Sequence, residues 1–323
     1  MVSTRFRALA ATAVAALALC TACSSEGSGS DTPAGGQLDL AAFASLNGVP
    51  AFAADDAGVF AEHGLKVKIS TAKTSTEMVP QLLGGKVDLA LVDTATSLVA
   101  AGRGVDLVYV AGATNGGIPK GQEDFSFANV WVKKDSPIKS LADLTGKTVG
   151  VPQIKSQPWV DLRGSVDKAG GDSASIKFVE SPDTLAALKS GQVDATTTSE
   201  PVGSVERAKG DLRPLGPVNS GGGGIAYVWI TTRSFAEANR DLVKSFAEAV
   251  REGNAAVNDD HALLVKTAAK VLNTDPALLE KAAFPVYAEK PLTAEDLEFS
   301  IKYLSKYDLF EKAAPDAGKL VGP

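Results

Sequence analysis

The chain has 323 residues, 45% of them hydrophobic, which is enough to bury a large core and corresponds to roughly two domains of about 150 residues each. Its 38 acidic and 32 basic residues give a net charge of -6, without a cluster of lysine and arginine. This balance argues against a nucleic-acid partner, because phosphate contacts require clustered basic side chains.

Residues 1–22 have the pattern of a secretory signal peptide. Arg5 and Arg7 precede an apolar run at 8–19 that contains a single polar residue. A run of this length fits the apolar region of a leader and is too short to span a bilayer. Residues 23–36 are small and polar without periodicity, which predicts a flexible tether.

The two cysteines of the chain, Cys20 and Cys23, lie at the end of that leader. A metal-binding or redox Cys-x-x-Cys pair needs a folded setting, and a disulfide so close to a leader would stabilise nothing. The third interpretation is a bacterial lipobox with the lipid on Cys23. Thr21 and Ala22 precede Cys23 and are the small residues that a lipobox prefers before its cysteine. Cys20 is preceded by Leu19, which fits a lipobox poorly. We therefore expect Cys23 to anchor the protein to a membrane.

After the tether, apolar strands alternate with helices. Strands are predicted at 37–43, 65–70, 87–92 and 105–111, with helices at 51–63, 77–84 and 97–102 between them. This alternation implies a parallel sheet covered by helices on both faces. Residues 114–124 then form a longer irregular loop, and the strand predicted at 125–133 leaves this lobe.

The segment at 74–96, TSTEMVPQLLGGKVDLALVDTAT, has an echo 106 positions later. In register, Leu82, Gly85, Val87 and Asp88 match Leu188, Gly191, Val193 and Asp194. Each copy predicts a polar loop, a short helix, a glycine turn, a strand and a second polar loop. A unit that is used twice indicates two similar lobes. The second lobe is predicted to hold strands at 148–151 and 176–180, a helix at 158–168, the echo at 181–201 and a closing segment at 206–215.

The last third of the chain begins with a strand and continues as helices. The strand at 225–231 is predicted to lie beside the long strand that leaves the first lobe. Ser234 with Glu237, and Thr293 with Asp296, have the spacing of a helix capping box. We interpret the apolar residues at helical spacing in this region as core packing.

Ligands of doubly wound sheets bind beyond the carboxyl ends of the strands. The corresponding loops are 44–49, 71–76 and 93–96 in the first lobe and 152–157, 180–183 and 198–202 in the second. Their polar side chains often precede a helix, where free N–H groups favour negative ligand groups. These candidates are Asn47, Thr74, Ser75, Thr76, Thr94, Thr96, Gln153, Ser156 and Gln157. The alternative, that they are ordinary helix N-caps, stays open.

Five further residues near these loops are candidates for ligand contact. Lys73 and Lys155 are the basic side chains in the six loops, and Lys155 would either pair with a carboxylate or sulfonate or remain solvated. Trp159 would either stack on a ring or lie in the core. Asp93 and Glu200 end matching strands and could bind an amine, although Glu200 could instead cap the following helix. Ser199 lies beside Glu200 in the loop 198–202.

The sequence offers little that predicts catalysis. His63 and His261 lie outside the six loops, and the chain has neither a Gly-x-Ser-x-Gly nor a His-x-x-x-His motif. It also lacks a phosphate-binding loop, and no cysteine remains in the body of the chain. We expect a protein that is not an enzyme and uses neither a cofactor nor a metal.

Five segments occur in an order that is typical of one family. They are GVFAEHGL at 58–65, GKVD at 85–88, VKKDS at 132–136, SLADLTGKTVGVP at 140–152 and GQVDA at 191–195. Over residues 38–232 the chain resembles the substrate-binding lipoproteins of ABC importers, in the nitrate/sulfonate/taurine branch that includes thiamine-precursor binders. Two departures are that Ser199 stands where the family shows an aromatic residue, and that the six loops contain no arginine.

The resemblance implies an α/β, two-lobed periplasmic-binding-protein fold of type 2. Each lobe would be a mainly parallel sheet flanked by helices, with two crossing strands between the lobes and a helical C-terminal tail. Lobe one would comprise 37–132 plus 225–323, and lobe two 133–224.

The same resemblance implies a function in solute uptake. A small polar or anionic molecule, similar to a sulfonate, taurine or nitrate, would be held between the lobes and delivered to an ABC permease and its ATPase; a thiamine-precursor pyrimidine is the alternative. A related branch makes that pyrimidine with iron and a cysteine-rich segment, which this chain lacks. We expect a monomer on the extracytoplasmic face of a membrane.

Overall fold

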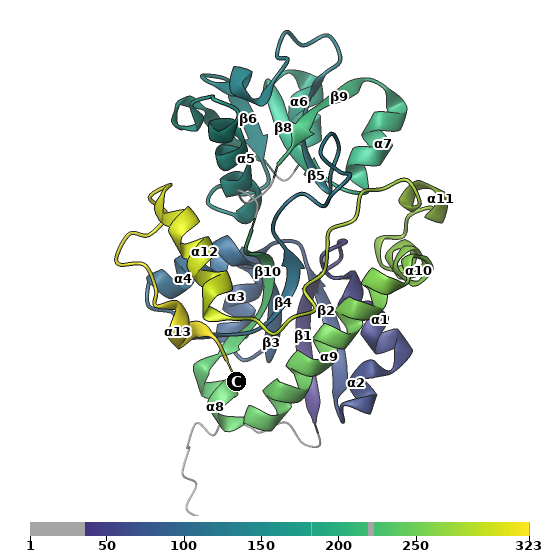
Figure 1. The fold of residues 1–323 in the computed structure, drawn as a ribbon, viewed down its shortest axis with the longest axis vertical. Coiled ribbons are helices and arrows are strands. Elements are labelled where there is room, and N and C mark those ends of the chain that lie inside the picture. Colours follow the sequence, from purple (N-terminus) through teal and green to yellow (C-terminus); the bar gives the residue numbers. More distant parts are fainter. Residues whose placement is uncertain (1–35, 182, 219–222, 323) are drawn as a thin grey trace, which may run out of the picture. The chain divides into compact units, whose positions relative to one another are not determined.

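Two five-stranded β-sheets form the framework of the chain (Figure 1). The computed structural model describes residues 36–181, 183–218 and 223–322, which belong to one compact unit. The signal peptide predicted at 1–22, nearly all of the tether predicted at 23–36 and Cys23 lie outside the described residues.

The first sheet has the strand order β2-β1-β3-β10-β4. Its strands are β1 (Gln37–Phe43), β2 (Lys66–Ala72), β3 (Leu89–Asp93), β4 (Leu107–Asn115) and β10 (Ile225–Thr232). Strand β1 runs parallel to β2 and β3, whereas β10 is antiparallel to β3 and β4. The four strands predicted before residue 112 are confirmed: β1 has the predicted boundaries, and those of the other three move by one to four residues.

The second sheet repeats this arrangement in the order β7-β6-β8-β5-β9. Its strands are β5 (Ala128–Lys133), β6 (Thr148–Val151), β7 (Lys177–Glu180), β8 (Ala195–Ser199) and β9 (Leu212–Pro217). Strand β6 is parallel to β7 and β8, and β5 is antiparallel to β8 and β9. Both sheets therefore consist of three parallel strands, one antiparallel strand and a final edge strand, which confirms the predicted duplication.

The pairing predicted for β10 was wrong. Strand β10 lies between β3 and β4, while β5 lies between β8 and β9, so these two strands are in different sheets. In the chain, β5 follows β4 of the first sheet but is the antiparallel strand of the second sheet. Likewise, β10 follows β9 of the second sheet but is the antiparallel strand of the first. The expected boundary at 132/133 also cuts through β5, which belongs to the second sheet as a whole. Periodicity located these strands, but it carries no information about their partners.

Helices cover both sheets. Before β5 the chain forms α1 (Val49–Ala57), α2 (Val59–Glu62), α3 (Ser75–Leu83) and α4 (Thr94–Gly102). The second half contributes α5 (Gln157–Lys168), α6 (Thr184–Ser190) and α7 (Val202–Lys209), with short 3-10 turns at Leu141–Leu144 and Ser173–Ser175. The C-terminal helices are α8 (Arg233–Ala238), α9 (Arg240–Asp259), α10 (His261–Leu272), α11 (Pro276–Leu279), α12 (Ala294–Ser305) and α13 (Ala317–Leu320). The single helix predicted at 51–63 is divided into α1 and α2, because Gly58 adopts a φ of 81° and ends α1.

Alternate residues of each strand pack on opposite faces of its sheet. In β1, Leu38 and Leu40 belong to a core that includes Phe60 and Phe246, so α2 and α9 cover this face. Ala41 belongs to another core, shared with α3, α4, α12 and α5. In Figure 1, α9 crosses the first sheet, whereas α12 lies beside α4. The second core therefore joins the inner faces of both halves.

The aspartates of the repeated segment hold neighbouring strands together. Asp88 accepts a hydrogen bond from the Asp39 backbone N–H at 2.7 Å, and Asp194 accepts one from Thr148 at 2.9 Å. The backbone N–H groups of both aspartates bond back to the same two residues. The shared Gly-x-Val-Asp pattern thus joins β3 to β1 and β8 to β6, and its role is structural.

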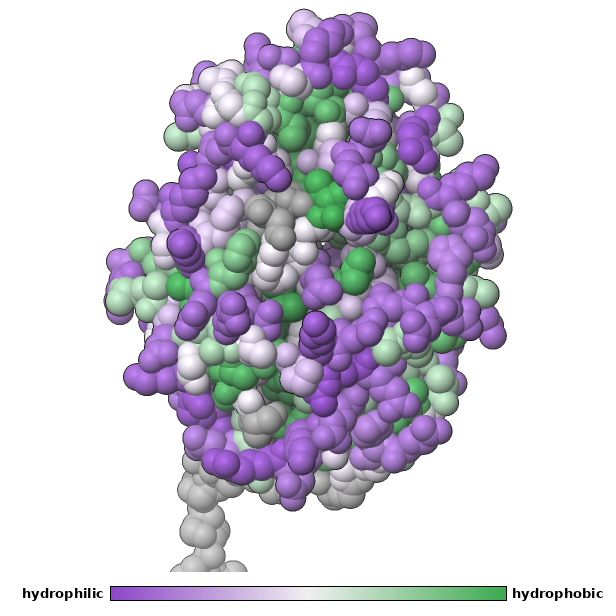
Figure 2. All heavy atoms as spheres, in the orientation of Figure 1, coloured by the Kyte–Doolittle hydropathy of each residue, from purple (hydrophilic) through white to green (hydrophobic). Residues whose placement is uncertain are grey.

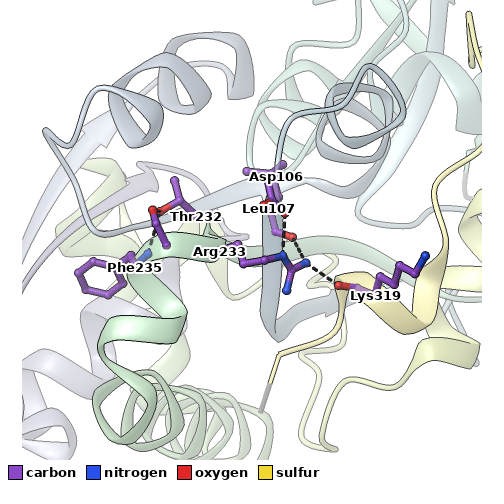
Figure 3. A network of polar contacts seen from close by, with 7 residues as sticks. Asp106, Leu107, Thr232, Arg233, Phe235 and Lys319 are labelled. Carbon is purple, nitrogen blue, oxygen red and sulfur yellow. Dashed lines mark hydrogen bonds and ion pairs between the residues drawn. The ribbon is translucent and has the colours of Figure 1, made fainter. Parts of the chain in front are cut away.

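A polar network at the start of the helical tail holds the C-terminal segment (Figure 3). Arg233 pairs with Asp106 at 2.7 Å and donates to the carbonyl oxygen of Lys319 at 2.6 Å. The N-cap of α8 is Thr232, so the capping box predicted from Ser234 and Glu237 was wrong. Both of those residues lie inside the helix.

The capping box predicted in the second half of the tail is confirmed. Thr293 caps α12, and Asp296 bonds back to the Thr293 backbone. On the face drawn in Figure 2, hydrophilic side chains cover most of the surface and hydrophobic side chains form small groups. Within 36–181, 183–218 and 223–322, every helix is too short or too polar to cross a bilayer.

Candidate functional site

A cavity of about 110 Å³ has walls from both sheets. Thr114 of β4 and Tyr227 of β10 line it from the first sheet, and Thr197 and Ser199 of β8 line it from the second. The first turns of α5 complete the wall with Asp161. The cavity therefore lies where the carboxyl ends of the strands were expected to meet.

Several oxygens in the cavity wall lack hydrogen-bond partners within the described part of the chain. They are Asn47 Oδ1, Thr114 Oγ1 and Thr197 Oγ1, on residues that are 6%, 1% and 3% exposed. A buried polar atom without a partner destabilises a folded protein, so native structures rarely contain one. Three such atoms around one cavity are typical of a binding site. Asn47, Gln157 and Ser199 are the sequence-predicted residues that line this cavity.

Gln153 connects the loops of the two sheets beside the cavity. Its Nε2 donates to Thr96 Oγ1 at 3.2 Å, and its Oε1 accepts from Thr76 Oγ1 at 3.4 Å. Thr76 and Thr96 are in the first turns of α3 and α4, whereas Gln153 precedes α5. Three predicted residues thus contact one another and do not line the cavity.

Asp93 connects the same two halves through its carboxylate. Its Oδ1 accepts from the backbone N–H of Thr96 at 2.8 Å and from that of Gln157 at 3.0 Å. It therefore caps α4 and also occupies the N-terminal end of α5, where each helix presents free N–H groups. Gln157 itself lines the cavity.

The other polar candidates in the first-lobe loops bond within the first half of the chain or have no partner in the described residues. Thr74 accepts from the Glu77 N–H at 3.3 Å, so it is the N-cap of α3. Ser75 accepts from the Asp93 N–H at 2.9 Å. Thr94 is fully buried, and its Oγ1 has no partner in the described residues. None of these three is in the cavity lining.

On the second rim, Ser156 and Lys155 are also absent from the cavity lining. The Ser156 hydroxyl donates to the Gln153 carbonyl oxygen at 2.7 Å and so shapes the turn before α5. Lys155 is exposed and has a φ of 64°. The turn therefore positions Gln153 and Gln157.

Trp159 and Glu200 are buried outside the cavity lining. The Trp159 ring packs on Phe178 with centroids 5.4 Å apart. Glu200 accepts from the Ser204 N–H at 3.2 Å; burial raises the pKa of this carboxyl, and its bonds with Ser204 and the Arg207 charge partly oppose that rise. Both residues fit the structural alternatives considered from the sequence.

Sequence reasoning missed two ionisable residues of the cavity, Asp161 and Tyr227. Asp161 is one turn after Gln157, whose Nε2 donates to Asp161 Oδ1 at 2.8 Å. Burial, followed by the charge of Asp93, raises the pKa of Asp161 to about 8, although the bond from Gln157 opposes the shift. Helical spacing from Gln157 was the available signal.

Burial also raises the pKa of the Tyr227 phenol, and the charges of Asp93 and Asp161 add to the rise, whereas a hydrogen bond with Asn47 lowers it. The Tyr227 ring meets the edge of Phe43 at 5.6 Å. A tyrosine within the apolar run 225–230 was a signal that could have been read from the sequence.

The two duplicated sheets with a cavity between their strand ends define a type 2 periplasmic-binding-protein fold. The chain belongs to the family described as NMT1/THI5 like, whose model matches residues 45–261. The resemblance inferred from the five sequence segments is thereby confirmed.

Curated relatives and a solved structure agree with this assignment. The chain is 28% identical to the "Putative aliphatic sulfonates-binding protein" of Escherichia coli, over 59% of each chain. It is 25% identical to a formylaminopyrimidine-binding protein of Halalkalibacterium halodurans, over 62% of this chain and 60% of the relative. These matches therefore span about three fifths of the relatives' lengths.

The structure of the alkanesulfonate-binding protein SsuA from Xanthomonas axonopodis pv. citri, bound to MOPS, shares the fold. Its TM-score is 0.74 at 22% identity, with 88% of this chain and 98% of that chain covered.

Proposed function

We propose that the protein is a solute-binding component of an ABC importer, which holds a small polar molecule between its two sheets. The main support is the pair of contacts beside the cavity, from Gln153 to Thr76 and Thr96 and from Asp93 to the Gln157 N–H. These bonds form only when the two halves approach each other, and such closure excludes water from a bound solute.

In this proposal, several of the predicted site residues fall into two groups. Asn47 and Ser199 contact the solute, because they line the cavity. Thr76, Asp93, Thr96 and Gln153 hold the closed arrangement. The curated relatives are named for sulfonates and for formylaminopyrimidine, so a sulfonate-like anion and a pyrimidine are the two ligand classes to test first.

The remaining parts of the proposal concern location and partners. The protein would act on the extracytoplasmic face of a membrane, anchored through a lipid on Cys23, and would deliver its solute to a permease with an ATPase. It would bind the solute without converting it, as a monomer and without a cofactor.

Mass spectrometry of small molecules released from the purified protein tests this function. We expect one solute per chain, which returns when the emptied protein is incubated with it. Gln153→Ala should weaken the binding roughly thirtyfold, because it removes two hydrogen bonds worth about 1 kcal/mol each and tenfold in affinity is about 1.4 kcal/mol. Gln192→Ala, at an exposed glutamine, is the control and should bind as the native protein does.

Two results would contradict the proposed function. One is the absence of a released solute together with no stabilisation by sulfonates, nitrate, pyrimidines or amines. The other is turnover of the solute by the purified protein, which would indicate an enzyme.

A further inference from the structure

Among the described residues, those that line the cavity include a carboxyl group and no basic side chain. Among the described residues that line it, the ionisable ones are Asp161 and Tyr227. Asp161 is half-buried, and Gln157 Nε2 donates to one of its oxygens at 2.8 Å. A carboxylate offers about four acceptor sites on its two oxygens, so Asp161 has further capacity for a donor in the cavity.

The helix end at which an anionic ligand would be expected is already occupied by a carboxylate. Backbone N–H groups at a helix N-terminus bind anions, and α5 begins beside the cavity with Gln157. The Gln157 N–H donates to Asp93 Oδ1 at 3.0 Å, and the same oxygen accepts from Thr96 of α4 at 2.8 Å. The protein thus supplies its own anion at this position, and a second anion nearby would be repelled.

Arg163, a basic residue of α5, contacts residues outside the cavity lining. The Arg163 guanidinium lies 4.9 Å from the Trp159 ring and 4.5 Å from the Tyr307 ring. Its Nε donates to Ser173 Oγ at 3.2 Å. None of these partners lines the cavity, so Arg163 does not supply a positive charge to a ligand there.

The other polar groups in the wall also suit a ligand that donates hydrogen bonds. Asn47 Oδ1 is an acceptor only, and it has no partner in the part of the chain that the structure describes. The Thr114 and Thr197 hydroxyl groups also lack a partner in the described residues. A hydroxyl group can accept a hydrogen bond as well as donate one. The Phe127 side chain and several prolines form the apolar part of the wall.

We propose that the cavity takes a small ligand with a cationic nitrogen group, an amidine, guanidine or amine, and that Asp161 selects it. This inference rests on the proposed solute-binding function and specifies the ligand class of the same site. The ammonium or amidinium N–H groups would donate to Asp161 and Asn47, and the hydrocarbon part would contact the apolar wall. A sulfonate or nitrate would find the Asp161 carboxyl group, the Asp93 carboxylate beside the cavity and no cation among the described lining residues.

Probes of equal shape and different charge test the ligand class directly. Guanidinium and nitrate are both planar and trigonal, and benzamidine, benzamide and benzoate differ only in the polar group. Thermal unfolding at neutral pH and calorimetric titration, with methanesulfonate and taurine added to the panel, compare them on the same protein. We expect benzamidine or guanidinium to raise the unfolding temperature and the anions to leave it unchanged.

Two Asp→Asn variants, one in the cavity and one on the surface, test the role of Asp161. Asp161→Asn should reduce the affinity for the cationic probe at least tenfold, whereas Asp135→Asn, at an exposed residue of the second half, should not change it. Circular dichroism checks that both variants are folded.

The outcomes separate the two proposals. Tighter binding of nitrate, benzoate or a sulfonate than of the cations would overturn the ligand class and leave the solute-binding function intact. Equal binding of the cation by Asp161→Asn and the native protein would also overturn the inference. Binding of no probe of either charge would contradict both proposals.

Discussion

Two aspartates near the start of α5 have different tasks, although their side-chain chemistry is the same. Asp93 accepts from two backbone N–H groups, those of Thr96 and Gln157, and its charge serves the fold. Asp161 accepts from the Gln157 side chain and lines the cavity. The difference arises from where the chain places each carboxyl group: one faces helix ends, and the other faces the space that a solute would fill.

The raised pKa of Asp161 predicts a pH-dependent stability. The folded-state pKa of about 8 lies above the ordinary value of 3.8, so between these values the folded chain binds a proton that the unfolded chain has released. The free energy of unfolding therefore falls as the pH rises through this interval. Each unit of pKa difference is worth about 1.4 kcal/mol, so the effect should reach several kcal/mol.

Urea denaturation of Asp161→Asn and the native protein, at pH 5 and pH 8.5, measures this dependence. We expect the variant to gain stability relative to the native protein as the pH rises, because it has no carboxyl group to ionise. Tyr227 and Tyr303 stay neutral in this range, because burial raises the pKa of both phenols and the charge of Asp161 raises it further. A difference that is the same at both pH values would contradict the buried-carboxyl interpretation; Asp135→Asn is the control.

At the scale of elements, the repeated segment explains why both sheets have the same topology. Its glycines, Gly85 and Gly191, adopt φ values of 66° and 83° in the turn after a helix, a conformation that glycine adopts with little strain. The aspartate three residues later then fixes the start of the next strand to a neighbour, through Asp39 in one sheet and Thr148 in the other. The repeat thus encodes a helix-turn-strand connection, while the loops that follow it differ.

This structural role predicts unequal effects of one substitution in the two copies. Asp88→Ala should lower the free energy of unfolding by about 1–3 kcal/mol, because the half-buried carboxylate accepts the Asp39 N–H that would be left without a partner. Asp194→Ala should have a smaller effect, because Asp194 is exposed and water can replace it. Chemical denaturation measures both, and equal losses would contradict the assignment.

At the scale of the whole molecule, the two halves share a core as well as a cavity. The buried cluster around Ala41 and Val92 of the first sheet continues through Trp159 and Val160 of α5 to Val149 of the second. The C-terminal tail strengthens this connection, because Tyr307 of the segment after α12 donates to Asp167 of α5 at 2.8 Å. Closure around a solute would therefore depend on the tail as well as on the loops.

The proposed membrane anchor gives a prediction at this scale. Cys23→Ala should move the full-length protein from the membrane fraction to the soluble fraction, because no lipid can then be attached. Cys20→Ala is the matched control and should remain in the membrane fraction. Fractionation followed by intact-mass analysis distinguishes the two. Retention of the Cys23→Ala chain on the membrane, or release of Cys20→Ala, would contradict attachment through Cys23.

Patterns that depend on neighbours in the chain were predictable from the sequence. Strand and helix periodicities, the duplicated segment and the cap at Thr293 follow from local rules, so these elements are where we predicted them. The candidate site was only partly accessible in this way. Its rim loops could be located, because strand ends are visible in the sequence, but a threonine that caps a helix and one that meets a ligand look alike there. Whether Asn47 and Ser199 contact the solute stays a prediction.

The sequence by itself determined the α/β class, the two similar halves and the general place of the site, because these depend on periodicity and on a repeated local motif. Only the tertiary structure decided that β10 enters the first sheet and β5 the second, since strand pairing joins residues far apart in the chain. It also decided that Asp161 lies in the cavity while Trp159, two residues earlier, belongs to the core. The charge that a solute would meet depends on such placements, because burial and neighbouring carboxylates set it.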